Sequence, residues 1–227
     1  MIDCHVHYGQ WDKSNLLGVS SNIESINTTF KGFSEIYVMP SDGRGNVETA
    51  LALTRLEIKH KFIAWYRGQI KDIILSAPQA IKFHPVFMHA NVMSDCYLPA
   101  IQYAFERHIP IFIHTGTNPI SWYSIALELA RTYPEINFVL CHLGGEKADI
   151  QVDLAKEAKS VENVFLDLTG RHEFSIAKAF KVGNPHSFIW GSDFPIGHPK
   201  SGIATLEGFL KDNMVKILEE NPKAIWK

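Results

Sequence analysis

Histidines and an aspartate occupy regular positions in the first apolar stretch of the chain. The run MIDCHVHYGQ carries Asp3, His5 and His7 at alternate positions. Residues two apart in a β-strand point to the same face, and polar groups that share a buried face are costly unless they bind something there. Neutral imidazole is the commonest protein ligand for metal ions. The pattern predicts a metal site on this strand, although a His-x-His pair alone is weak evidence in a chain with 11 histidines.

Charged and imidazole side chains also end several later apolar runs. Lys82 and His84 end AIKFH, His114 ends IPIFIH, His142 ends INFVLCH and Asp193 ends SFIWGSD. If these runs are parallel strands, their carboxyl ends meet at one edge of the sheet, which is where α/β barrels place their active sites. Strand alternation predicts that each of these side chains points inward. The sequence therefore predicts one site built from several strand ends.

The elements that must position these residues are eight runs rich in β-branched and aromatic residues, separated by amphipathic stretches. Strands that alternate with helices predict an α/β fold, and eight such units predict a (β/α)8 TIM barrel. No low-complexity linker divides residues 1–227, so we expect a single compact domain. An open doubly wound sheet is the alternative. The predicted strands are 2–8, 35–40, 61–66, 80–84, 109–115, 136–143, 163–168 and 187–193.

Composition excludes several classes of protein. The chain has 22 basic and 24 acidic residues, so no basic face for nucleic acid is expected. It contains neither an apolar run of membrane-spanning length nor a basic and apolar leader. An odd number of widely spaced cysteines predicts no disulfides and a reducing, cytoplasmic location. Cys4 and Cys141 are expected to face away from the pocket.

Five short motifs, in chain order, resemble those of the amidohydrolase superfamily of metal-dependent hydrolases. The similarity is greatest to the branch that includes the aminocarboxymuconate-semialdehyde decarboxylase-like enzymes, the amidohydrolase-related proteins. CHLGG and GSDFP are the most distinctive of the five. The motifs are D-x-H-x-H (3–7), IKFHP (81–85), HTG (114–116), CHLGG (141–145) and GSDFP (191–195).

The resemblance implies a role for each matched residue. His5, His7, His114 and Asp193 would bind one divalent metal ion. His142 would hydrogen-bond the attacking water or the substrate, and Asp193 would also serve as the general base. Asp3 departs from the ligand pattern, and we expect it to orient a histidine instead.

The donor set bears on the identity of the metal. Three imidazoles and a carboxylate suit Zn²⁺, with Mn²⁺ or Fe²⁺ as alternatives. In two-metal members of the superfamily a carboxylated lysine bridges the ions, and Lys82 lies near that location, so a second metal stays open. We expect one metal, because the IKFHP-type lysine accompanies one-metal sites in this branch.

The predicted substrate-binding residues are Lys82, His84 and Arg171. A cationic or imidazole side chain at the site could hold an anionic group of the substrate. The leading hypothesis is hydrolysis of an amide, lactone or similar bond of a small molecule, and the alternative is decarboxylation of an aromatic or unsaturated acid. A TatD-like nuclease is disfavoured by the lysine at position 82 and by the net charge of −2. A non-catalytic metal-binding barrel is the remaining alternative. Short loops predict an open pocket, or one completed by a second subunit in a homo-oligomer.

Overall fold

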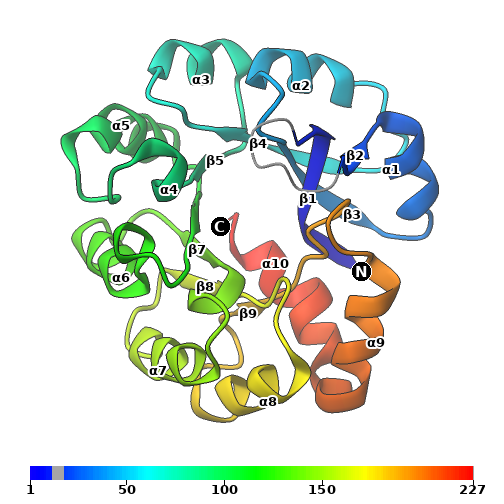
Figure 1. The fold of residues 1–227 in the computed structure, drawn as a ribbon, viewed down its shortest axis with the longest axis vertical. Helices are drawn as coiled ribbons and strands as arrows, with labels where there is room; N and C mark the ends of the chain where they lie inside the picture. Colours follow the sequence, from blue (N-terminus) through cyan, green and yellow to red (C-terminus); the bar gives the residue numbers. More distant parts are fainter. Residues whose placement is uncertain (12–17, 227) are drawn as a thin grey trace.

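The computed structural model describes residues 1–11 and 18–226. Eight parallel strands follow one another in chain order around a curled sheet, and a short strand, β2, pairs antiparallel with the end of β1 (Figure 1). Each predicted strand range overlaps one of the eight parallel strands. The strands are β1 (Ile2–Gln10), β2 (Ser20–Ser21), β3 (Glu35–Pro40), β4 (His60–Trp65), β5 (Ala80–Phe83), β6 (Ile111–His114), β7 (Phe138–Cys141), β8 (Val164–Asp167) and β9 (Phe188–Ile189).

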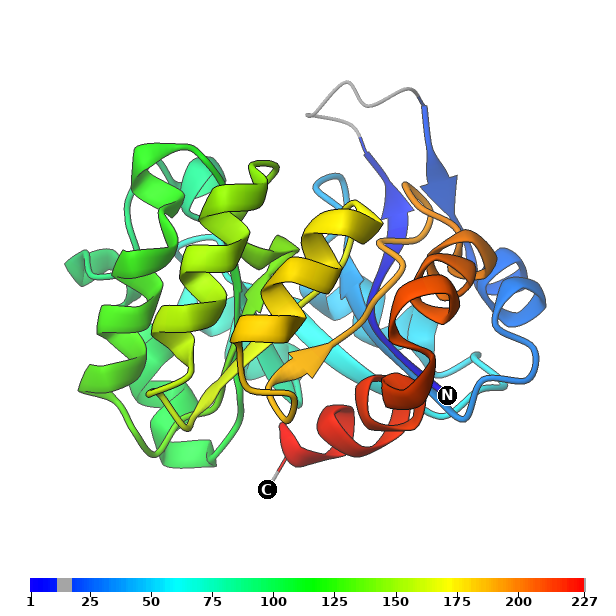
Figure 2. The same cartoon turned by 90° about the horizontal axis from the view of Figure 1, so that it is seen from below.

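Most helices surround the outside of the sheet, and the last one lies across its bottom, near the centre of the view in Figure 1 (Figures 1 and 2). The α-helices are α1 (Ile23–Thr29), α2 (Asn46–Leu53), α3 (Ile70–Ser76), α4 (Pro85–Met88), α5 (Leu98–Arg107), α6 (Tyr123–Thr132), α7 (Ala148–Ala158), α8 (Glu173–Val182), α9 (Pro199–Leu210) and α10 (Asn221–Ala224). Shorter helical segments are η1 (Asp95–Tyr97), η2 (Pro119–Ser121), η3 (His142–Gly144), η4 (Lys211–Asn213) and η5 (Lys216–Glu220). None of the helices in residues 1–11 and 18–226 is both long and apolar enough to cross a membrane.

The sheet curls round without closing as a continuous ladder. β1 and β9 lie at the seam, where one isolated parallel bridge joins Val6 to Phe194. An α/β fold with eight parallel strands is therefore observed as predicted, while the junction between the first and last of them is sparse. The main-chain hydrogen bonds at the seam are Cys4 N to Trp190 O (3.1 Å), His7 N to Phe194 O (2.7 Å) and Asp193 N to His5 O (2.8 Å).

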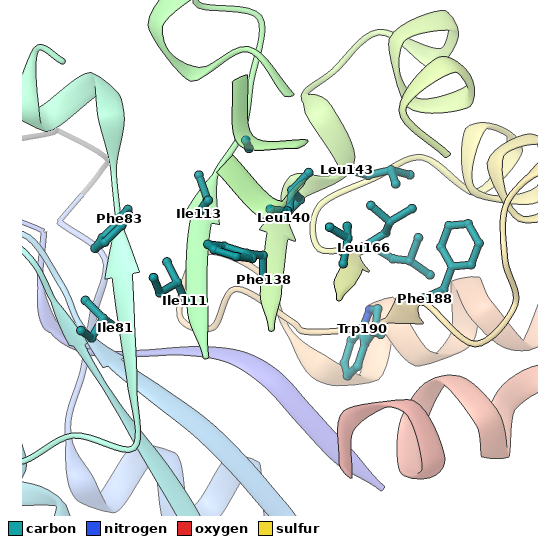
Figure 3. Close-up of a cluster of buried hydrophobic side chains, with 14 of the residues drawn as sticks. Ile81, Phe83, Ile111, Ile113, Phe138, Leu140, Leu143, Leu166, Phe188 and Trp190 are labelled. Carbon is teal, nitrogen blue, oxygen red and sulfur yellow. The ribbon is translucent and has the colours of Figure 1, made fainter. Parts of the chain in front are cut away.

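Apolar side chains form one layer outside the sheet and another inside it. Figure 3 shows part of the outer layer, in which residues such as Ile81, Ile113 and Leu140 belong to the cluster shared with the helices. The inner cluster fills the interior of the curled sheet with residues such as Phe112 and Val139. Ile225 belongs to this inner cluster, so the end of the chain packs beneath the strands. Burial on both faces explains why the strands read as continuous apolar runs.

An irregularity in β1 changes which side chains point inward. The pairing of β1 with β3 shifts register between Asp3 and Val6, so β1 carries one extra residue there. Cys4 belongs to the inner cluster, and His5, the next residue, also faces the interior, where it lines the cavity described below. Strict alternation does not hold across the shift. The prediction that Asp3 shares a face with His5 and His7 is therefore wrong.

Candidate metal centre

A cavity of about 650 Å³ opens at the carboxyl ends of the parallel strands. Aromatic side chains, including Trp11, Trp65 and Phe87, form part of its wall. All of the site residues predicted from the sequence line this one cavity, which brings together residues that lie up to 188 positions apart. These residues are His5, His7, Lys82, His84, His114, His142, Arg171 and Asp193.

His5, His7 and Asp193 form a compact group in which one potential ligand atom of each lies within 4.8 Å of the others. His7 Nε2 lies 3.2 Å from Asp193 Oδ1, and His5 Nε2 lies 3.6 Å from the same oxygen. The other ring nitrogen of His7 lies 3.3 Å from the carbonyl oxygen of Pro40. Both imidazoles therefore direct Nε2 toward one carboxylate.

This group has the properties expected of a site for a divalent metal ion. Two imidazoles and a carboxylate are common zinc ligands. The His5 Nε2 atom is buried and has no hydrogen-bond partner within the described part of the chain, and an unsatisfied buried polar atom is costly. A metal ion between the three side chains would satisfy this nitrogen, so the residues fit the group.

The backbone at the start of the GSDFP segment turns Asp193 into the cavity. Asp193 has a φ of 59°, in the left-handed region that aspartate tolerates better than most residues. Burial alone would raise the pKa of its carboxyl, but His5, the hydrogen bond with His7 and the nearby His142 hold that pKa well below its usual range. Asp193 is therefore ionised at neutral pH.

His114 and His84 lie on another part of the cavity wall. Their rings stack at a centroid distance of 4.0 Å, and His84 also stacks on Trp65. His114 is not part of the 4.8 Å group, so its role as a metal ligand stays a prediction. Burial, together with Lys82 and His5, lowers the pKa of His114 to about 3. Burial also holds the pKa of His84 far below its usual range.

The CHLGG segment places His142 in the cavity through a sharp turn after β7. His142 and Leu143 have φ values of 64° and 45°, so strand alternation ends at Cys141. Gly145 is required because its φ is 109° and a Cβ there would lie 3.0 Å from the Cα atom of Gly116. The rings of His142 and His114 form a T-shaped pair with centroids 4.8 Å apart, and the centroid of His142 lies 5.0 Å from that of His5. Burial lowers its pKa well below the usual value.

The prediction for the two buried cysteines holds only in part. Neither Cys4 nor Cys141 lines the cavity, but both belong to the inner cluster inside the sheet instead of facing the helices. Lys82 is 2% exposed and donates a hydrogen bond from Nζ to Cys141 Sγ, at 2.9 Å. The shifted register of β1 and the turn after β7 are the physical reasons, since both let consecutive residues face the interior.

The expectation that Asp3 orients a histidine ring is also wrong. Its carboxylate accepts hydrogen bonds from the main-chain N–H groups of His5 and Ser192. The residue that contacts the His5 ring is Asp167, whose Oδ2 lies 2.8 Å from His5 Nδ1. Asp167 is not among the residues predicted for the site, although it follows the same rule as the others: it is a charged residue near the end of the strand-like run NVFLDL.

Arg171 lies in the loop after β8 and contributes the guanidinium group of the cavity wall. It is half-buried, and its Nε donates to the carbonyl oxygen of Thr169 at 3.1 Å. Burial lowers its pKa, although Asp167 and Glu146 oppose that shift. Arg44, another arginine, forms an exposed pair with Glu48 and does not line the cavity.

Comparison with known proteins identifies the family. The amidohydrolase family model matches residues 44–227, so the chain belongs to the amidohydrolase superfamily, as the five motifs predict. No curated protein sequence is significantly similar to the chain.

Several solved structures share the fold over nearly the whole chain. A probable 2-pyrone-4,6-dicarboxylic acid hydrolase from Acinetobacter baumannii, with citric acid bound, has a TM-score of 0.76 at 14% identity and covers 99% of this chain and 98% of its own. 5-Carboxyvanillate decarboxylase from Sphingomonas paucimobilis has a TM-score of 0.74 at 8% identity, covering 100% and 98%. An amidohydrolase from Burkholderia multivorans with bound zinc has a TM-score of 0.74 at 11% identity, covering 99% and 95%. At these identities the similarity shows the fold alone.

Proposed function

We propose that this protein is a metal-dependent hydrolase that cleaves an amide, lactone or similar bond of a small molecule. The observation that carries the proposal is the convergence of His5 Nε2 and His7 Nε2 on the Asp193 carboxylate inside the cavity. His5, His7 and Asp193 would hold one divalent cation, most simply Zn²⁺, with His114 as a further ligand. A cation in this position supplies an electrophile for the substrate carbonyl and makes water nucleophilic at neutral pH.

The remaining roles follow from protonation and position. Asp193 is ionised, so its carboxylate can take a proton from the attacking water and pass it to the leaving group. His142 is neutral, because burial lowers its pKa, and a neutral imidazole can both donate and accept a hydrogen bond with the substrate. These two residues are the proposed catalytic pair.

We infer that the substrate carries a carboxylate. Arg171 contributes a half-buried guanidinium to the cavity wall, and guanidinium groups bind carboxylates through paired hydrogen bonds. Lys82 adds a second cation at the buried end of the cavity, and His84 adds a buried Nδ1 without a partner in the described residues. The acids named for two structural relatives, 2-pyrone-4,6-dicarboxylic acid and 5-carboxyvanillate, support a substrate of this kind.

The broader setting of the enzyme is part of the same proposal. We place residues 1–227 in one (β/α)8 barrel domain, supported by eight parallel strands in chain order. Free cysteines at positions 4, 96 and 141 support a reducing, cytoplasmic compartment. We propose that the protein binds a small-molecule substrate and that its other partners are further copies of the same chain, in a homo-oligomer.

Metal analysis joined to an activity screen tests the proposal. Protein purified without chelator should contain roughly one equivalent of zinc or manganese per chain, because the proposed ligands surround a single site. It should hydrolyse members of a panel of carboxylated lactones and amides, and chelation should abolish that activity. Release of CO₂ from aromatic acids without any hydrolysis would replace the proposal with the decarboxylase. Absence of any tightly bound divalent metal would overturn it.

A further inference from the structure

Asp167 contacts the His5 ring on the nitrogen that does not face Asp193. Asp167 Oδ2 lies 2.8 Å from His5 Nδ1, while His5 Nε2 faces Asp193 Oδ1 at 3.6 Å. The side chains of His5 and Asp167 are each only 1% exposed. The two ring nitrogens of His5 therefore meet two different carboxylates, one on the wall of the cavity and one behind the ring.

Thr169 holds the Asp167 carboxylate in place. Asp167 Oδ1 accepts hydrogen bonds from the main-chain N–H of Thr169, at 3.0 Å, and from its hydroxyl. The Thr169 hydroxyl oxygen also lies 3.0 Å from the carbonyl oxygen of Gly191, just after β9. Thr169 is fully buried. Oδ1 of Asp167 is thus occupied by Thr169, which leaves Oδ2 to face His5.

We propose that Asp167 is a positioning residue that decides which nitrogen of His5 binds the metal. Asp167 keeps the proton on His5 Nδ1, and this leaves the Nε2 lone pair for the cation beside His7 and Asp193. The inference rests on the proposed metal centre and deepens it. Partners of this kind raise the basicity of a ligand histidine and fix its tautomer, and their loss costs 10–100-fold in metal affinity.

A second cation site in this region is excluded by the contacts already made. His5, Cys141 and Asp167 also lie within 4.8 Å of one another. However, Lys82 Nζ contacts the Cys141 sulfur at 2.9 Å, and both carboxylate oxygens of Asp167 already accept hydrogen bonds. A lysine ammonium in contact with one of the three donors repels a metal ion. The arrangement therefore suits support of His5 and not a separate metal site.

Zinc affinity of the chelator-stripped full-length protein, measured by competition with a fluorescent chelator, tests the inference. Asp167→Asn keeps the size of the side chain and removes its charge, and it should weaken zinc binding roughly 10–100-fold. Thr169→Val removes the hydroxyl that holds Asp167 and should weaken binding several-fold, whereas the matched control Thr169→Ser keeps the hydroxyl and should bind within about twofold of the wild type. Folded Asp167→Asn protein with unchanged zinc affinity would overturn the proposal.

The protonated nitrogen can also be observed directly in the zinc-loaded wild type, which removes any dependence on the folding of variants. Long-range ¹H–¹⁵N correlation spectra should show a proton on His5 Nδ1 and none on Nε2. A proton on Nε2 with Nδ1 free of one would refute the inference. Zinc binding by the wild type separates the two proposals: if the wild type binds no zinc, both fail, and if it binds zinc with the opposite tautomer, only the role of Asp167 fails.

Discussion

His5 and the stacked pair of His84 and His114 line the same cavity in opposite electrostatic states, although burial lowers the pKa of His7 beside His5 as well. On one side, His5 lies between the carboxylates of Asp167 and Asp193. Burial and the charge of Lys82 oppose its protonation, but the two carboxylates raise its pKa to about 10. On the other side, His84 and His114 stack on each other and His84 also stacks on Trp65, and neither ring has an acidic hydrogen-bond partner in the described residues.

The difference shows what distinguishes a metal centre from a cluster of buried histidines. Burial lowers the pKa of an imidazole wherever it occurs, and this effect prevails at His84 and His114, where the charge of Asp193 offsets only part of it at His114. At His5 the acidic partners hold positive charge in place. A divalent cation can substitute for that charge, so the side with Asp193 is the side that attracts a metal. The stacked side offers neutral rings, of which His84 suits a planar or polar substrate and His114 is the proposed further ligand.

Asp193→Asn should have the largest effect, because it removes the carboxylate that both imidazoles share. Asparagine also tolerates the left-handed backbone at this position, so the protein should fold. Loss of the general base predicts a fall in kcat of about 10³-fold. Steady-state kinetics with circular dichroism as the folding control would check this. A variant that keeps more than a tenth of the wild-type kcat would contradict the assignment.

The low pKa of His114 should make the free energy of unfolding depend on pH. The pKa of His114 is about 3 in the folded protein and 6.5 in an unfolded chain. Below pH 6.5 the unfolded chain therefore binds a proton that the folded protein refuses until about pH 3, and the stability present above pH 6.5 is lost as the pH falls through this window. Between pH 6.5 and pH 5 the loss is at most about 2 kcal/mol.

The matched control for this prediction is His114→Phe, which keeps a stacking ring and cannot titrate. Urea unfolding at pH 6.5 and pH 5 gives, for each protein, the slope of its free energy of unfolding against pH. The two slopes are then compared. The comparison is needed because burial raises the pKa of Asp3 to about 7, and that group acts in the opposite direction, favouring the folded state at low pH. Equal slopes for the two proteins would show that His114 is not held neutral.

His84→Phe should have the smallest effect and would sharpen the contrast between the two sides. Phenylalanine can keep the stack on His114 and Trp65 while removing the unpartnered Nδ1. The free energy of unfolding should be unchanged or slightly higher, because the substitution removes Nδ1, a buried polar atom that has no hydrogen-bond partner in the described residues. If Nδ1 binds substrate, KM should rise roughly 2- to 10-fold, the worth of one hydrogen bond, with zinc content unchanged. A loss of zinc instead would mean that His84 itself contributes to the metal centre.

Much of the fold and the site was accessible from sequence because both depend on local patterns. Continuous apolar runs of the right length predicted the eight parallel strands, and charged residues at their ends predicted His5, His114 and Asp193 as neighbours of one cavity. Asp167 obeys the same rule but lies in none of the five motifs.

The sequence by itself determined which residues gather at the carboxyl ends of the strands, because chain order and strand length dictate where each run ends. Only the tertiary structure decided which way those residues point. An extra residue in β1 turns both Cys4 and His5 inward, and left-handed turns at His142 and Asp193 bring these side chains into the cavity. Such local departures from alternation depend on pairing with neighbouring strands, so their energy is not contained in any single segment of the chain.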